Sequence, residues 1–294
     1  MRGIIAAALL LVLAGCDRSP APPPVAATPG PVKPAMWEVR AANGATAWLF
    51  GTIHALEAPV VWRSQTVERA LGEADRIVVE VAQLEGAGTA ETFTKLSRTA
   101  GLPPLSARLP ADQKTALDRA LARAKMDDHH FRDVETWASA LLLVRAVDPS
   151  LKPEHGIDRA VLKAAGGRPV AELEGAQTQL SIFDALPEKE QRDLLTLVVN
   201  DAGGNADESP ALAKAWREGD MTAIEAETRR DLLADPELRA ALFTGRNTAW
   251  TAKIAEMLGR GEKPFVAVGA AHMAGPEGVP ALLAAQGFAV KRVQ

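Results

Sequence analysis

One short pattern occurs twice in this chain of 294 residues, and it constrains the fold more than any other feature. Residues 47–54 read Ala-Trp-Leu-Phe-Gly-Thr-Ile-His, and residues 264–272 read Pro-Phe-Val-Ala-Val-Gly-Ala-Ala-His. In each copy an apolar run typical of a buried strand meets a glycine, and a histidine follows three residues later. The repeat therefore predicts two strand ends that deliver His54 and His272 to one site.

Composition places the chain among soluble globular proteins. It is 47% hydrophobic and 24% charged, which is ample for a buried core, and the length favours one large domain or one domain with an insert. The net charge is −4, and Lys and Arg are scattered without interleaved aromatic residues, so nucleic acid is not an expected partner. The sequence predicts no particular oligomeric state.

The N-terminus reads as a bacterial lipoprotein signal peptide over residues 1–15. A short apolar run over residues 4–12 leads into Leu-Ala-Gly-Cys at 13–16, so we expect cleavage before Cys16 and acylation of that residue. A plain secretory signal is the alternative. The expected location is the bacterial cell envelope, facing the periplasm, and Asp17 slightly favours the inner membrane.

Cys16 is the only cysteine. The folded domain therefore has no internal disulfide, no zinc site with cysteine ligands and no cysteine nucleophile. Residues 16–35 are rich in proline and are expected to form an extended tether between the lipid anchor and a folded domain at 36–294.

The remaining pattern predicts an α/β fold, with a mixed β-sheet core, flanking helices and a large helical insert at about 90–150 between the N- and C-terminal strands. Asn43-Gly44 marks a hairpin that would make the first two strands antiparallel. Strands are expected at 36–40, 45–51, 76–81, 168–174, 265–268 and 288–293, and helices at 65–73, 111–124, 134–147, from 157, and at 177–200, 210–219, 221–233, 237–258 and 279–285.

Familiar catalytic motifs are missing, including the serine-hydrolase elbow, the Walker loop, the dinucleotide fingerprint and His-Glu-x-x-His. What remains is a set of polar residues that follow apolar runs: His54, Glu80, Glu174 and His272. The carboxyl ends of parallel strands line one crevice, so these residues can converge. Two imidazoles and a carboxylate suit a catalytic divalent metal, and a second carboxylate could accept a proton from water. The pattern thus favours a hydrolytic site.

These residues stand in motifs that resemble the TraB/GumN family, which includes the animal Tiki proteins. The resemblance spans essentially the whole chain after the tether, with the motifs in the family's order. It rests on residues 48–54, 77–80, 156–158, 173–174 with 179–180 and 183, 215–220, 246–247 with 250, 266–272 and 275–278.

The resemblance implies an α/β core and a site like that of Tiki proteins, which are membrane-tethered, metal-dependent proteases needing paired Gly-x-x-His motifs and a glutamate. It carries His54 and His272 over as metal ligands or catalytic histidines, and Glu80 as a ligand or general base. Arg246, Asn247 and Glu174 are carried over as orienting or charge-stabilising groups. The expected ion is Mn²⁺ or Co²⁺, with Zn²⁺ as an alternative.

Together these expectations describe an envelope-anchored, metal-dependent hydrolase, most consistent with a peptidase that acts on a peptide or protein. The alternative is a non-catalytic periplasmic lipoprotein that binds a peptide, haem or a metal in the same cleft. A role in exopolysaccharide handling has little compositional support, because the chain has no Tyr and only 4% aromatic residues.

Overall fold

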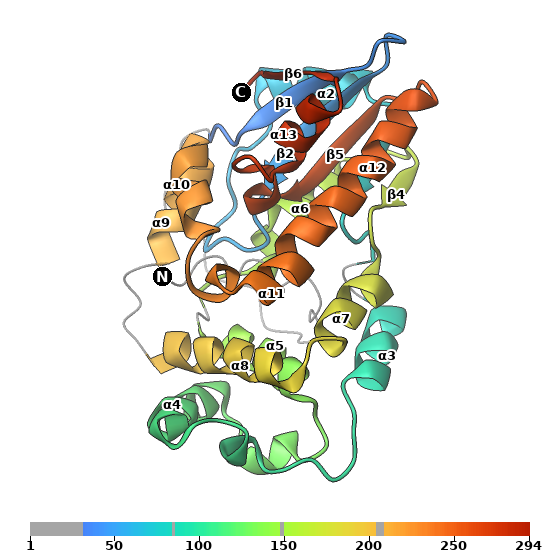
Figure 1. The fold of residues 1–294 in the computed structure, drawn as a ribbon. Helices are drawn as coiled ribbons and strands as arrows, with labels where there is room; N and C mark the ends of the chain where they lie inside the picture. Colours follow the sequence, from blue (N-terminus) through green and yellow to red (C-terminus); the bar gives the residue numbers. More distant parts are fainter. Residues whose placement is uncertain (1–31, 84–85, 148–149, 204–208) are drawn as a thin grey trace.

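The structure is a computed structural model that describes residues 32–83, 86–147, 150–203 and 209–294 (Figure 1). The predicted signal peptide, Cys16, Asp17 and most of the tether lie outside the described residues. Within the described ranges, no helix combines the length and the apolar character needed to cross a membrane.

Six strands form one mixed sheet in the order β4-β3-β5-β2-β1-β6. Neighbouring strands are parallel from β4 through β3 and β5 to β2, and β1 is antiparallel to both β2 and β6. The predicted hairpin is confirmed, and Gly44 takes a positive φ of 85° at its turn, which glycine adopts without strain. The strands are β1 (Met36–Arg40), β2 (Thr46–Thr52), β3 (Arg76–Val79), β4 (Val170–Glu172), β5 (Pro264–Gly269) and β6 (Ala289–Arg292).

Helices cover both faces of the sheet, which explains why its central strands are continuously apolar. Ile77 and Val79 of β3 pack with α2 (Gln65–Glu73) and α6 (Ile157–Lys163) on one face. Val78 packs on the other face with α12 (Gly245–Gly259) and α13 (Val279–Ala285), seen in red and orange beside β5 in Figure 1. The predicted α/β class with flanking helices is thereby confirmed.

A separate helical layer with its own apolar core lies below the carboxyl ends of the parallel strands (Figure 1). Two stretches of the chain build it, because the chain returns to the sheet through α6 and β4 before completing the layer. Its helices are α3 (Ala87–Leu96), α4 (Lys114–Ala124), α5 (Thr136–Val147), α7 (Ala176–Asp184) and α8 (Glu188–Gly203), with α8 packed on α4 and α5.

The expectation of one helix over 177–200 is wrong. The chain forms α7 and α8 with a break at Leu186-Pro187, because proline disfavours helical backbone at the residue before it and supplies no N–H to the ladder. The helix expected at 221–233 is also too long, since α10 ends at Glu227.

The segment that leads into α12 is irregular. After α9 (Ser209–Glu218) and α10 (Met221–Glu227), the chain forms the short helix α11 (Pro236–Arg239) and then a π-helical turn over Ala240–Thr244. The helix expected at 237–258 is thus present as one run of right-handed helical backbone that contains a π-helical turn. Such π-helical turns re-aim the residues that follow them and are frequent at functional sites.

The last residues of the predicted tether, 32–35, belong to the folded body. Val32 is buried, and the backbone N–H of Gly51 donates to the carbonyl of Ala35 at 3.1 Å. Residues 32–35 therefore pack as part of the domain.

Candidate functional site

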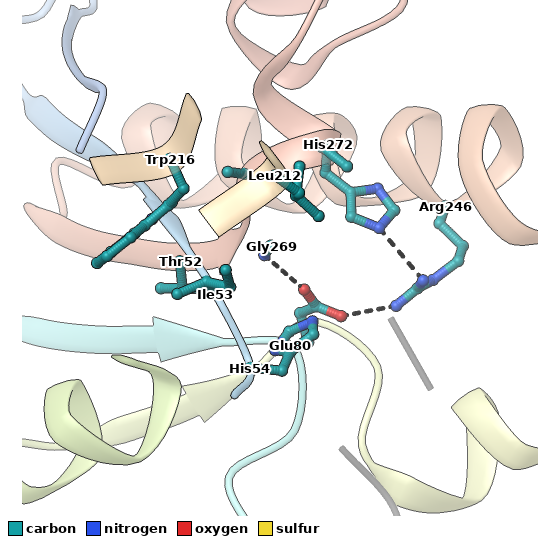
Figure 2. A pocket seen from close by; sticks show the side chains of 11 residues that line it. Thr52, Ile53, His54, Glu80, Leu212, Trp216, Arg246, Gly269 and His272 are labelled. Carbon is teal, nitrogen blue, oxygen red and sulfur yellow. Dashed lines mark hydrogen bonds and ion pairs between the residues drawn. The ribbon is translucent and has the colours of Figure 1, made fainter. Parts of the chain in front are cut away.

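His54, Glu80 and His272 line one pocket of about 50 Å³ at the carboxyl ends of β2, β3 and β5 (Figure 2). The three strands are parallel neighbours in the sheet, so residues that directly follow them meet at its edge. A pocket of this volume holds an ion or a few water molecules but not a peptide segment.

His54 is fixed by an aspartate. Its Nδ1 lies 2.6 Å from Oδ2 of Asp158, and the hydroxyl of Thr52 donates to the other oxygen of that carboxylate at 2.5 Å. Burial would lower the pKa of His54, but the charge and hydrogen bond of Asp158 raise it above its ordinary value. Burial would raise the pKa of Asp158, yet His54 holds it below its usual range. Asp158 therefore stabilises positive charge on this imidazole and orients Nε2.

His272 is fixed by an amide. The Asn247 side-chain nitrogen donates to the carbonyl of Glu277 at 2.7 Å, so the Asn247 oxygen faces Nδ1 of His272 at 2.6 Å. Arg246 approaches Nε2 of His272 at 3.3 Å, and a guanidinium can only donate. His272 thus carries its proton on Nδ1. Burial and the charges of Arg246 and His54 lower the pKa of His272 well below its ordinary value, so the ring stays neutral.

Glu80 is almost fully buried, with 2% of its surface exposed, and every contact it makes is with a donor. One carboxylate oxygen accepts from the backbone N–H of Gly269 at 2.8 Å, and the other accepts from Arg246 at 2.8 Å and from Gln179 at 3.3 Å. Donors from β5, α12 and α7 therefore fix the position of this carboxylate.

Arg246 joins the two carboxylates that follow β3 and β4. Its guanidinium donates to Glu80 and, through two nitrogens at 2.8 and 2.9 Å, to Glu174, whose oxygen also accepts from the Trp250 indole at 2.9 Å. The guanidinium also lies over the Trp250 ring, 4.6 Å from its centroid. One buried positive charge therefore faces two buried negative charges, so this group of three residues carries a net negative charge.

Gly269 is the point on which the three central side chains converge. A methyl group built there would lie 3.3 Å from Nε2 of His54, 3.4 Å from a carboxylate oxygen of Glu80 and 3.7 Å from Cδ2 of His272. Any larger residue would fill the space between the imidazoles and the carboxylate.

We predict that Gly269→Ala reduces activity or metal affinity by about 10-fold or more while the protein stays folded, because the methyl group displaces side chains that must be held within a few tenths of an ångström. Gly72→Ala is the matched control, since a methyl group at Gly72 in α2 meets nothing within 4 Å. Equal effects of the two substitutions on affinity for Co²⁺ would contradict this account of Gly269.

The donor groups fit a divalent cation in type. Both imidazoles have Nδ1 paired with an oxygen, as metal-bound histidines do, and the Glu80 carboxyl group lies beside them. In this structure the Arg246 guanidinium donates hydrogen bonds both to the Glu80 carboxylate and to Nε2 of His272. Among the described residues no three His, Cys, Asp or Glu are grouped closely enough to hold an ion as they stand. His54, His272 and Glu80 could hold a metal once Arg246 has withdrawn from His272.

A family model described as the TraB/PrgY/gumN family matches residues 35–292, which is the whole described domain apart from its first and last residues. The chain belongs to the TraB/PrgY/gumN family. The resemblance stated from the sequence motifs is thereby confirmed.

Two bacterial proteins illustrate how far members of the TraB/PrgY/gumN family have diverged. The chain is 26% identical over 244 residues to the uncharacterized protein YbaP of Escherichia coli (strain K12), which covers 80% of this chain and 86% of YbaP. It has the same identity and coverage with YbaP of Shigella flexneri. No solved structure matches the chain.

The structure places all six residues singled out in the sequence around this site of the TraB/PrgY/gumN domain. His54, Glu80, Arg246 and His272 line the pocket, Asn247 holds His272, and Glu174 holds Arg246. Sequence reasoning gave no role to Asp158 or Gln179, which contact His54 and Glu80. Both lie within motifs of the family resemblance, but neither follows an apolar strand, so spacing alone could not single them out.

The neutral state of His272 predicts an acid-sensitive stability in the metal-free domain. The unfolded chain protonates this histidine below about pH 6.5, whereas the native state does not until its lowered pKa is reached, so folding loses about 1.4 kcal/mol per pH unit from this residue in that window. His54, whose pKa is raised, acts in the opposite window and loses its contribution as the pH rises above about 6.5.

We therefore expect His272→Gln to flatten the decline in unfolding free energy between about pH 6.5 and 5.5, measured by urea denaturation in EDTA. His129→Gln, at an exposed position, should retain the wild-type slope. An unchanged slope in His272→Gln would show that this histidine takes up a proton in the native state.

Proposed function

We propose that this protein is a metal-dependent hydrolase, most consistent with a peptidase, that works at the bacterial cell envelope while anchored by a lipid on Cys16. The observation that carries the proposal is the matched fixation of two imidazoles. Asp158 and Asn247 hold Nδ1 of His54 and His272 at 2.6 Å each, which turns both Nε2 atoms toward the pocket beside Glu80, where Arg246 donates to Nε2 of His272 at 3.3 Å. This is how histidine ligands of catalytic metals are held in proteins.

Each residue has a distinct part in this proposal. His54 and His272 supply the imidazole ligands, and Glu80 supplies the carboxylate, as a third ligand or as the base that takes a proton from water. Arg246 is positioned to stabilise negative charge that develops on a substrate oxygen, and Glu174 keeps its guanidinium in place. A divalent ion held by His54, His272 and Glu80 would supply Lewis-acid chemistry, which can polarise a carbonyl group and activate water near neutral pH.

The ion proposed is Mn²⁺ or Co²⁺, with Zn²⁺ as an alternative, because imidazole and carboxylate ligands accept all three. The charge balance supports a cation at this position. Glu80 and Glu174 outnumber Arg246, and Asp158 raises the pKa of His54, so the side of the pocket lined by Glu80 and His54 favours positive charge. At His272 the charge of Arg246 acts in the opposite direction, so an ion there requires Arg246 to move away.

Cleavage of a peptide library tests the function. The protein is stripped with EDTA, and Mn²⁺, Co²⁺ or Zn²⁺ is then restored with the peptides present. We expect cleavage that disappears with the ion and returns on its addition. No turnover with any divalent ion would reject the hydrolase, and binding of peptide, haem or metal without turnover would favour the non-catalytic lipoprotein instead.

The anchor is a separate prediction. Cys16→Ser should leave the protein unacylated and move it from the membrane fraction to the soluble fraction of cells, because no other cysteine is present and no described helix is suited to span a membrane. The assay is fractionation with metabolic lipid labelling. A variant that still sediments wholly with membranes would show that another element attaches it.

A further inference from the structure

A groove of about 1210 Å³ opens beside the small pocket and shares Arg246 with it. It runs between the start of α8 with α7 on one side and the π-helical turn with α12 on the other. Glu174 and Trp250, which hold Arg246, also line it. The small pocket admits only an ion or a few water molecules, so a peptide that reaches the site must lie in this larger groove.

The walls of the groove combine apolar side chains with a few charged groups. Ile182, Leu186 and Ala241 contribute apolar surface, which suits the aliphatic stem of a long side chain. Lys253 also lines the groove, but its ammonium group donates to the carbonyl of Leu173 and is therefore engaged.

Glu190 is the exceptional residue of the groove. It lies in the first turn of α8, only 3% of its surface is exposed, and its Oε2 has no hydrogen-bond partner. Its Oε1 accepts a hydrogen bond from the Lys189 ammonium group at 3.3 Å, and the same ammonium group donates to Asp193 at 2.9 Å. A buried carboxylate oxygen without a donor is costly, which indicates that a donor from outside the described contacts belongs there.

Glu237 faces Glu190 from α11 on the opposite wall of the groove. A hydrogen bond that the protonated Glu237 carboxyl makes to Glu190, together with the charges of Glu190 and Asp235, raises the pKa of Glu237. Two carboxylates that face each other have no hydrogen between them unless one takes up a proton. A cationic donor would satisfy both, and the exposed Glu237 side chain can turn to admit it.

We propose that this groove binds a peptide segment with a lysine or arginine side chain whose charge lies between Glu190 and Glu237, so that an adjoining peptide bond is held toward Arg246 and the histidines. This specificity rests on the proposed function. It assigns the peptide class and two residues that determine it.

Binding of defined peptides tests the inference without requiring turnover. The full protein, stripped with EDTA, is titrated with fluorescein-labelled decapeptides that are acetylated and amidated at their ends, so that charge comes only from side chains. Matched peptides carry lysine, arginine, norleucine or glutamate at one central position. We expect lysine and arginine peptides to bind about 10- to 100-fold more tightly than the norleucine peptide, as hydrogen bonds to charged groups do.

Substitution of the carboxylates supplies the second arm. Glu190→Gln combined with Glu237→Gln should bring the lysine and norleucine peptides to equal affinity. Glu68→Gln is the control, because Glu68 lies on α2 and its carboxylate pairs with Arg63. This variant should keep the wild-type preference. Because the peptide comparison is made on wild-type protein, it stands even if the double variant does not fold.

The outcomes separate this inference from the proposed function. Equal binding of lysine and norleucine peptides by wild type, no binding of any basic peptide, or a preference that survives in the folded double variant would overturn the inference. Metal-dependent cleavage without a basic preference would overturn the inference alone, whereas basic-peptide binding without cleavage by any ion would overturn only the hydrolase.

Discussion

Arg246→Met is expected to lower the free energy of unfolding by about 3–5 kcal/mol, because it leaves two buried carboxylates without their common partner. Glu80 is 2% exposed and Glu174 is similarly buried, and both accept from the guanidinium at 2.8 to 2.9 Å. Breaking a buried ion pair from one side costs far more than the pair contributes as a whole, since the remaining charge stays desolvated.

The measurement is urea denaturation in EDTA at neutral pH. Arg260→Met is the matched control, because the Arg260 side chain is 55% exposed and solvent screens its ion pairs with Glu256 and Glu262. Adding Glu174→Gln to Arg246→Met should recover part of the loss, since it removes one unpaired charge. A loss in Arg246→Met no larger than in Arg260→Met would show that these carboxylates are solvated or protonated in the native state.

His54→Ala and His272→Ala are each expected to lower kcat/KM for metal-dependent peptide cleavage by more than about 100-fold. This lower bound follows from the smaller effect expected for residues that only orient a ligand. Removing a residue that only orients a metal ligand costs about 10- to 100-fold, so Asp158→Asn and Asn247→Ala should fall in that range and direct ligands beyond it. Both orienting contacts are 2.6 Å long and buried, so solvent does not replace them readily.

His129→Ala is the control for this series, because His129 is exposed on the helical layer and does not line the pocket. Circular dichroism and thermal unfolding establish that each variant is folded before its kinetics are compared. If His54→Ala retained wild-type kcat/KM with every ion, that histidine would have no part in the reaction. If Asp158→Asn cost more than His54→Ala, Asp158 itself would be the reacting group.

The sequence was most informative where local pattern and sheet topology act together. Apolar runs that end at Gly51, Glu80 and Gly269 predicted strands, and parallel pairing then brings the residues after them to one edge. Asn43-Gly44 predicted the antiparallel hairpin by its turn chemistry alone. These features depend on a few neighbouring residues, which is why one sequence sufficed.

Other parts of the site depend on contacts between distant segments. Asp158 opens a helix and reaches His54 across 104 positions of sequence, and Arg246 reaches Glu80 across 166. Contacts between residues so far apart in the chain produce no periodic pattern in the sequence. Glu190 falls within the helix expected at 177–200, and no local pattern distinguishes it, because its burial arises only when α8 packs beside α11 and the π-helical turn. Pro187 in the sequence indicates a break in the helix expected at 177–200. The helical spacing of apolar residues continues on both sides of this proline, however, and so conceals the break.

Binding of Co²⁺ to the EDTA-stripped protein, followed by calorimetry and by the visible spectrum of the ion, decides whether His54 and His272 form a metal centre. We expect one Co²⁺ per wild-type chain, loss of that binding in both His54→Ala and His272→Ala, and its retention in His129→Ala. Unchanged stoichiometry and affinity in either folded pocket variant, or no Co²⁺ bound by wild type, would contradict a metal centre built from the paired Gly-x-x-His motifs.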